Sequence, residues 1–445
     1  LVFNGLTRID LDLTVKPDLA ERWESSADLK TWTFHLRPGV KFHHGRALDA
    51  DDVVATMRRI LDPATGSRAR SILDMVDTVD KIDAATVRFT LKIAYAGFQD
   101  IFGERQLKIL PRDKLHEIAT HPIGTGPFMF KAYEPGDRIE LVKNPNYFEA
   151  GLPKLDGVIL RIIPEAAGRL AALDSGSIDL LWNLPYEAIG QVTKNPAIAI
   201  SSVATATWDG VILNNARKPF DDVRVRQALA LTIDKAQLVQ IVLFGQGAPT
   251  HSPIPPSHPY FNTELGFPKP DIARAKQLLA EAGYPNGFEV PMQVPQEREA
   301  RVRLGVAVRD MAQAAGIRIN VERVPFDSYT VNVSGKAQMY VDGYFARPTI
   351  DTAVYPFYHS AGSWNTKLWN YKNDEVDRLL DQSRVTQDEA ARKKIFWSVQ
   401  KIAEETVPGI IAYSANHVNG YRKTVQGFRS TPMQWLELKE VTLAP

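Results

Sequence analysis

The alternation of strand-like and helix-like segments along the whole chain is the feature that most constrains its fold. In the first half, apolar and polar residues alternate at strand spacing in three segments, 85–93, 138–144 and 157–163. In the second half, apolar residues recur at helical spacing in 222–243, 271–283, 300–316, 374–384 and 388–405. Strand-like segments also occur there, at 317–324, 409–415 and 418–425. The sequence therefore predicts a mixed α/β fold in both halves.

Two local structures are predicted near the beginning of the chain. Residues 31–46 alternate apolar and polar side chains around a Pro-Gly pair at 38–39, which predicts a β-hairpin with its turn at that pair. A helix is predicted over 48–61. Asp49 is its expected N-cap, because a carboxylate accepts hydrogen bonds from the unpaired N–H groups of the first helical turn.

Length and composition exclude several classes of protein. A chain of 445 residues is long enough for two or three domains with cores of their own. Its formal net charge of +1 gives no bulk attraction to nucleic acid, so no nucleic-acid partner is predicted. The chain has no cysteine, which excludes disulfides, thiol nucleophiles and thiolate metal sites. No apolar run approaches the ~20 residues that a membrane-spanning helix requires.

The glycines of IGTGPF (123–128) do not match a nucleotide-binding loop. A dinucleotide loop needs a third glycine where Met129 stands, and a P-loop needs a Lys-Ser/Thr pair after its glycines. Strand-like sequence follows this stretch, so no helix N-terminus is available to a phosphate. We predict a structural turn that leads into a strand.

No catalytic or metal-binding motif is present. H-E-x-x-H and G-x-S-x-G are absent, and His251 and His258 fit no compact zinc spacing. His43 and His44 are expected on opposite faces of a strand, where they cannot chelate one metal together. We therefore predict no catalytic residue, no metal site and no cofactor.

Five long blocks of the sequence carry a family pattern. They are PDLAERWESSADLKTWTFHLRPGVKFHHGRALDADDVV (17–54), the central block from IGTGPF to IDLL (123–181), NNARKPFDDVRVRQALALTIDK (214–235), DIARAKQLLAEAGYPNGFE (271–289) and GYFARPTIDTAVYPFYHSAGSWNTKLWNYKNDEVDRLLDQSR (343–384). In this order, the blocks resemble the extracytoplasmic solute-binding proteins of ABC importers. The likeness is to the dipeptide, oligopeptide and nickel family (family 5, cluster C), and it covers nearly the whole chain.

The resemblance implies a two-lobed α/β clamp, the type II periplasmic-binding-protein fold, with an extra subdomain at about 30–120 in the first lobe. Lobe I would comprise 1–207 and 416–445, and lobe II would comprise 208–415. Strands near 204–214 and 414–420 would cross between the lobes and form the hinge. A solute bound between the lobes would stabilise the closed state, which is then presented to an ABC permease in the inner membrane.

The same resemblance implies a location and a missing segment. The protein is expected to be a periplasmic or otherwise extracytoplasmic monomer. The chain opens with LVFNGLTRID, which has the character of the inside of a fold. We expect a first strand and, in the precursor, a signal sequence to precede it.

The segment DGYFARPTIDTAVY (342–355) is the part of the ligand-facing block that the resemblance places at the solute. In peptide-binding relatives it carries an acidic residue that pairs with the α-ammonium of the peptide. Here Tyr344 stands where those relatives have Trp, and Asp351 is the acidic residue that remains, so Asp351 is the candidate ammonium partner. Arg347 is a cation in the same segment, and its guanidinium fits a carboxylate or phosphate, although a surface ion pair is the alternative.

Further candidate ligand-binding residues lie on loops and strand ends. Trp364 and Asn365 stand together in a polar, glycine-containing stretch, and an aromatic ring beside an amide suits a solute pocket. Core packing is the alternative for Trp364. The other candidates are expected at the edge of the cleft, at the hinge or on a lobe I loop, and they are Trp182, Asn183, Trp208, Arg105 and Gln106.

Two classes of function follow, and the family resemblance favours the first. The first is a receptor that captures a small polar solute and delivers it to an ABC importer. Its solute is predicted to be a short peptide or peptide-like compound, with an opine-like sugar–amino-acid conjugate or other carboxylated solute as the alternative. The second class is an enzyme, such as a hydrolase, on a two-lobed α/β scaffold. A receptor differs because it returns its ligand unchanged and gains thermal stability by mass action.

Overall fold

The computed structural model describes residues 1–11, 13–67, 69–347 and 349–444, and it divides the chain into two compact units. Unit 1 contains 1–201 and 418–445, and unit 2 contains 202–417. The limits predicted for the lobes differ from these by a few residues, and their action as a clamp stays a prediction. The chain passes between the units within two long strands that are neighbours in one sheet, β11 (Ile198–Leu213) and β16 (Ile410–Arg422).

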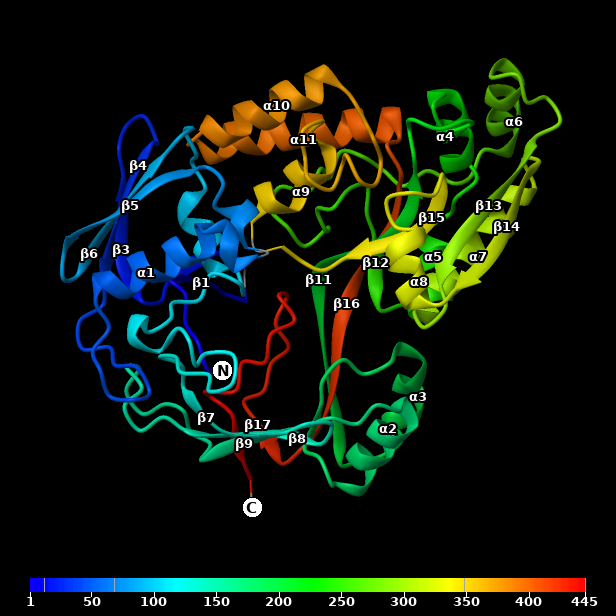
Figure 1. Ribbon diagram of the computed structural model, residues 1–445. Coiled ribbons are helices and arrows are strands. Elements are labelled where there is room, and N and C mark those ends of the chain that lie inside the picture. The colour runs from blue at the N-terminus through cyan, green and yellow to red at the C-terminus, as the bar shows by residue number, and fades with distance from the viewer. Residues whose placement is uncertain (12, 68, 348, 445) are drawn as a thin grey trace. The chain divides into compact units, whose positions relative to one another are not determined.

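Unit 1 consists of short strands with few helices (Figure 1). Its strands are β1 (Thr7–Ile9), β2 (Val15–Pro17), β3 (Ala20–Ser25), β4 (Thr31–Leu36), β5 (Val76–Asp83), β6 (Thr86–Leu91), β7 (Phe128–Glu134), β8 (Arg138–Lys143), β9 (Gly157–Arg161), β10 (Leu180–Leu181), β17 (Val425–Gln426) and β18 (Thr442–Leu443). Its α-helices are α1 (Ala50–Leu61), α2 (Ala166–Ser175) and α3 (Ile189–Val192). Short 3-10 turns lie at Pro63–Thr65, Arg70–Ile72, Phe98–Gly103, Arg112–Lys114 and Tyr186–Ala188.

A four-stranded sheet of order β3-β4-β6-β5 has its own core, in the region where the extra subdomain is predicted. Phenylalanines dominate this core, and the ring centroid of Phe34 lies 5.5 Å from that of Phe89 and 5.0 Å from that of Phe102. The predicted hairpin over 31–46 is wrong. Its first half, β4, pairs with β3 and β6, because the apolar face of β4 is buried against this larger core.

Helix α1 begins as predicted. The Asp49 side chain accepts a hydrogen bond from the Asp51 N–H, and the Asp52 side chain accepts one from the Asp49 N–H. This reciprocal capping box satisfies donors that the first helical turn leaves unpaired.

The glycine stretch IGTGPF leads into β7, as predicted, but its glycines serve close packing. A Cβ atom on Gly124 would lie 2.1 Å from the Val2 carbonyl oxygen, and one on Gly126 would lie 2.4 Å from the Leu1 carbonyl oxygen. The Gly126 N–H donates to the Val2 carbonyl over 2.9 Å. These glycines therefore let the first residues of the chain lie directly against the loop.

Unit 2 is built around a twisted mixed sheet covered by helices (Figure 1). Its further strands are β12 (Gly247–Pro249), β13 (Phe288–Pro295), β14 (Ile317–Val324) and β15 (Met339–Tyr344). Its helices are α4 (Val223–Ala230), α5 (Lys235–Leu243), α6 (Ile272–Glu281), α7 (Glu299–Gln313), α8 (Phe326–Asn332), α9 (Ile350–Tyr358), α10 (Asp374–Val385) and α11 (Glu389–Thr406). The helix predicted over 222–243 is two helices, because Asp234 caps a new one at Lys235.

The strand that carries the predicted ligand-facing segment lies inside this sheet. Strand β15 pairs antiparallel with β11 and parallel with β13, and β13 pairs parallel with β14. Helix α7 packs on β13, β14 and β15. A Cβ atom on Gly305 of α7 would lie 2.7 Å from a Val294 methyl, so glycine allows the helix to approach the sheet closely.

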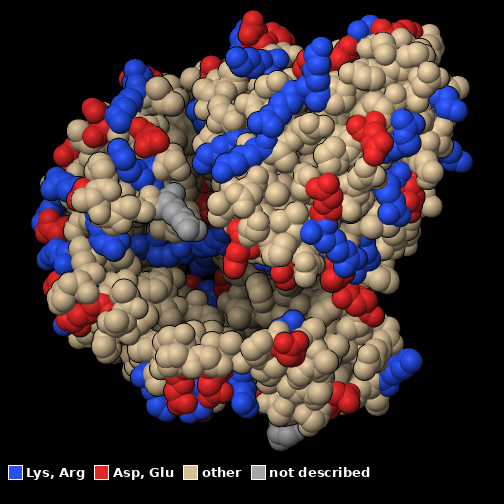
Figure 2. Space-filling model, turned by 45° about the vertical axis from the view of Figure 1, so that its right-hand side comes forward, with Lys and Arg blue, Asp and Glu red and all other residues tan. Residues whose placement is uncertain are grey.

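The predicted mixed α/β class is confirmed in both units. Among the residues described, no helix is long and apolar enough to cross a membrane. Acidic and basic side chains are interspersed on the face shown in Figure 2, in keeping with the formal net charge of +1.

Candidate functional site

A pocket of about 520 Å³ lies within unit 1 and is called the unit 1 pocket. It is lined by residues from distant parts of the sequence, which include Asp18, Arg105, Lys108, Tyr147, Trp182 and Trp435. Two tryptophans and several charged groups therefore share one cavity. Its volume falls in the range of roughly 300–1,000 Å³ that is usual for small-molecule sites.

Asp18 forms a fixed polar wall of the unit 1 pocket. Its carboxylate accepts hydrogen bonds from Asn4 Nδ2 at 2.9 and 3.2 Å and from the Gly5 N–H at 3.2 Å, and 4% of the residue is exposed. Burial raises the pKa of Asp18, while the charge of Lys108 and the hydrogen bond from Asn4 oppose that rise. Burial also raises the pKa of Tyr147, so its hydroxyl stays protonated.

The segment that carries Lys108 is anchored on both sides. The Ile109 N–H donates to the Asn4 carbonyl over 3.0 Å, and the Leu110 N–H donates to Thr56 Oγ1 over 3.0 Å. Lys108 stands between Leu107 and Ile109, which are both fully buried. Because side chains alternate along an extended segment, Lys108 points away from the core and lines the pocket.

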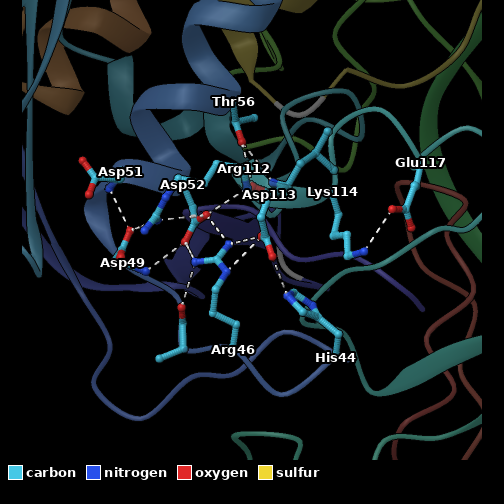
Figure 3. Close-up of polar contacts among 12 residues, drawn as sticks. His44, Arg46, Asp49, Asp51, Asp52, Thr56, Arg112, Asp113, Lys114 and Glu117 are labelled. Atoms are coloured by element: carbon cyan, nitrogen blue, oxygen red, sulfur yellow. Dashed lines mark hydrogen bonds and ion pairs between the residues drawn. The ribbon is translucent and has the colours of Figure 1, made fainter.

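Beyond Leu110, the same segment ends in an ion-pair network at the N-terminus of α1 (Figure 3). Asp52 is fully buried, and its carboxylate accepts hydrogen bonds from both terminal nitrogens of Arg46 at 3.0 and 2.6 Å. It also accepts a hydrogen bond from the Arg112 N–H at 3.0 Å. Arg46 bonds Asp113 as well, at 2.9 Å. The network fixes the backbone that follows Lys108.

Two predicted residues, Arg105 and Trp182, lie together in the unit 1 pocket. Trp182 is 43% exposed, and its Nε1–H donates to the Gln434 carbonyl over 3.3 Å. Asn183 follows with a φ of +62°, and its backbone N–H donates to Asn419 Oδ1 over 2.8 Å. Gln106 is exposed beside Arg105 and is outside the residues that line the pocket.

In unit 2, three predicted residues form one aromatic cluster at the end of β15. The ring centroid of Tyr344 lies 5.3 Å from that of Trp208 and 4.9 Å from that of Trp364. Trp208 is 2% exposed and also packs on Trp369, so it belongs to the core of unit 2. Tyr344 and Trp364 are half-buried at the edge of this core.

Asn365 and Asp351 are both engaged within unit 2. Asn365 is fully buried, and its Nδ2 donates to the carbonyls of His359 and Tyr371 at 2.8 and 2.9 Å. Its Oδ1 accepts the Tyr371 N–H at 2.9 Å, so the side chain holds the loop together. The Asp351 carboxylate receives two hydrogen bonds of 2.9 Å from Arg384. Asp351 already has a cation partner, which weighs against its role as a partner for a ligand ammonium.

Arg347 is half-buried in the segment between β15 and α9. Burial raises the pKa of Tyr344, and the positive charge of Arg347 is among the nearby charges that act on this hydroxyl. Arg347 is therefore close enough to Tyr344 for its charge to affect the Tyr344 hydroxyl.

Arg301 of α7 holds the backbone directly before Tyr344. Its Nε donates to Asp209 Oδ1 over 2.8 Å, its Nη1 to Asp342 Oδ1 over 2.7 Å and its Nη2 to the Gly343 carbonyl over 2.8 Å. Tyr413 donates to the second oxygen of Asp209 over 3.2 Å. Burial raises the pKa of Asp342, and the charge of Arg301 opposes it. This network ties β11, β15, β16 and α7 together under the candidate segment.

Several of these residues were not predicted from the sequence. Lys108 had a signal, because it is a lone charge in the apolar run LKIL (107–110). Trp435 also had one, because a tryptophan follows a proline-containing loop. Arg301 had no signal, since its partners come from strands that are distant in the sequence. Within the described part of the chain, no group of three or more His, Asp or Glu side chains is arranged to hold a metal.

Comparison with known proteins places the chain in a family. The family model described as "Bacterial extracellular solute-binding proteins, family 5 Middle" matches residues 14–365. The glutathione-binding protein GsiB of Escherichia coli is 29% identical over 444 residues, which cover 97% of this chain and 86% of that protein.

Solved structures agree with this placement. The binding protein AgaA from A. tumefaciens, in complex with agropinic acid, has 27% identity and a TM-score of 0.85, covering 100% of this chain and 93% of that one. The ABC transporter-associated periplasmic binding protein DppA from Helicobacter pylori, in complex with the peptide STSA, has 25% identity and a TM-score of 0.87, covering 100% of this chain and 92% of that one.

These matches confirm the predicted family and the periplasmic-binding-protein fold. The relatives are solute-binding proteins that work with ABC transporters, so the prediction that the chain is not an enzyme is confirmed as well. The chain belongs to the bacterial extracellular solute-binding proteins of family 5.

Proposed function

We propose that this protein captures a short peptide or peptide-like solute outside the cytoplasm and delivers it to an ABC permease in the inner membrane. It acts as a monomer and needs neither nucleic acid nor a cofactor. Its two units close on the solute as the lobes of a clamp. Family membership supports the receptor role, and the relatives GsiB and DppA support the peptide-like solute.

The unit 1 pocket is the observation that carries this proposal. It combines two aromatic rings, Trp182 and Trp435, with the charged side chains of Arg105 and Lys108. Apolar walls with a few placed polar groups are the usual composition of a small-solute site. A peptide offers matching groups, since it has a carboxylate, a polar backbone and apolar side chains.

A second candidate solute is an opine-like conjugate or another carboxylated compound. The segment 342–355 favours it, because Arg347 adds a cation there and Asp351 is already bonded to Arg384. The likeness to AgaA, which was solved with agropinic acid, supports the same candidate.

A thermal-shift series tests the proposed function. The purified protein is heated with glutathione, the peptide Ser-Thr-Ser-Ala, agropinic acid and a sugar as the control. At a hundredfold excess over Kd, a true solute adds about 2.7 kcal/mol, which raises Tm by a few degrees. Mass spectrometry should recover the solute unchanged.

The thermal shifts distinguish a peptide-like solute from an opine-like one. A shift with either peptide supports the main proposal, and a shift with agropinic acid alone supports the opine-like candidate. The absence of a shift with all three contradicts both. Small-angle scattering tests closure, because a clamp must lower its radius of gyration at saturating solute.

A further inference from the structure

The ammonium of Lys108 lines the unit 1 pocket, and among the described residues it has no hydrogen-bond acceptor. Over the described ranges of the chain, no hydrogen bond or ion pair reaches its Nζ. The group lies 5.2 Å from the centre of the Trp435 ring. A methyl group placed on Gly5 would lie 3.5 Å from it. Because Lys108 lines the pocket, its ammonium can donate to a solute bound there.

Two other cations of the same pocket, unlike Lys108, form ion pairs within the protein. Arg8 and Lys439 also line it, but both are bonded to Glu149. The Asp18 carboxylate accepts hydrogen bonds from Asn4 and the Gly5 N–H, and it acts on Lys108 as a nearby negative charge. The protein therefore pairs Arg8 and Lys439 with Glu149 and leaves the Lys108 ammonium available to a solute.

We propose that Lys108 binds a carboxylate of the transported solute and sets the preference of this protein for anionic solutes. This inference rests on the proposed function, because it places a specificity-determining residue in the same pocket. An ammonium that donates to a carboxylate makes hydrogen bonds about twice as strong as neutral ones. The Trp435 face beside the ammonium adds a cation–π contact that holds the side chain in place.

The charges around Lys108 are consistent with a binding site for an anion. Burial lowers the pKa of its ammonium, while the negative charges of Asp18, Glu437 and Glu104 oppose that decrease. A carboxylate at hydrogen-bond distance compensates for the lost hydration more directly than these more distant acids do. Binding of a carboxylate should therefore stabilise the protonated, charged form of Lys108.

Calorimetry with matched probes tests the proposal. Ser-Thr-Ser-Ala is titrated as the free acid and as the C-terminal amide, glutathione as the free acid and as the derivative with both carboxyl groups amidated, and agropinic acid is titrated as well. In the wild type, the acid should bind about ten- to hundredfold more tightly than its amide. Lys108→Met should remove that preference, by weakening the acid and leaving the amide nearly unchanged. Lys81→Met, which changes an exposed lysine paired with Asp51, is the matched control.

The outcomes distinguish this inference from the proposed function. Equal affinity for acid and amide in the wild type overturns the role of Lys108 and needs no variant, so it holds even if Lys108→Met fails to fold. Unchanged binding of the acid by a folded Lys108→Met protein also overturns it, while the receptor function stands. If the wild type binds none of the probes, both proposals fall.

Discussion

Removal of the Arg301 guanidinium should destabilise unit 2 strongly. Arg301→Met deletes three hydrogen bonds and leaves two carboxylates, Asp209 and Asp342, without their cation. Breaking a buried ion pair on one side costs about 3–5 kcal/mol. The three side chains retain 11–18% exposure, so water screens part of the loss and the lower end, about 3 kcal/mol, is expected. In a unit of about 200 residues, this lowers Tm by roughly 6–12 °C.

The stability lost in Arg301→Met should be smaller at acid pH than at neutral pH. Burial raises the pKa of Asp342, and Arg301 opposes that rise. A carboxyl group whose pKa is higher in the folded state stabilises the fold at acid pH, and this contribution is lost as pH rises through the folded pKa. Arg301→Met raises that pKa further. The deficit of the variant relative to the wild type should therefore be largest at pH 7 and shrink toward pH 5.

Urea unfolding at pH 5 and pH 7, followed by circular dichroism, measures both effects. Asp342→Asn in the Arg301→Met background should recover part of the loss, because an amide carries no charge. Arg309→Met on the same helix is the matched control, since its pair with Asp310 is exposed. A deficit below about 1 kcal/mol at pH 7, or one that does not change with pH, would refute the reasoning, because unpaired buried carboxylates cost more.

Three further predictions follow from the described contacts. Gly343→Ala should destabilise unit 2 in urea unfolding, because its Cβ would lie 2.4 Å from the Trp208 carbonyl oxygen, whereas Gly190→Ala has open space and should be neutral. Asn365→Ala should cost about 2 kcal/mol or more in the same assay, because it leaves buried carbonyls unpaired, yet calorimetry should find unchanged solute affinity. Affinity for an anionic solute found in the thermal-shift series should fall as pH rises through the pKa of Lys108, which burial lowers, and Lys108→Met should abolish this dependence.

Local signals in the sequence predicted most of the secondary structure, and they failed where tertiary contacts decide. Asp49 caps α1 as expected, since capping involves neighbours in the chain. The hairpin over 31–46 was wrong because alternation shows that β4 has one buried face and does not show which strand it pairs with. Trp208 was predicted at the site and lies in the core, since both places favour an aromatic ring.

The sequence by itself determined the mixed α/β class, the family pattern and the absence of thiol chemistry, because periodicity, motif order and composition are properties of the chain alone. Only the tertiary structure decided which charges are available. The sequence shows that Asp351 and Lys108 are charged, but it does not show their partners. In the structure, Asp351 is bonded to Arg384, 33 residues away, while Lys108 lines a pocket. The pairing of a charge depends on distances between segments that are remote in sequence, and folding alone sets those distances.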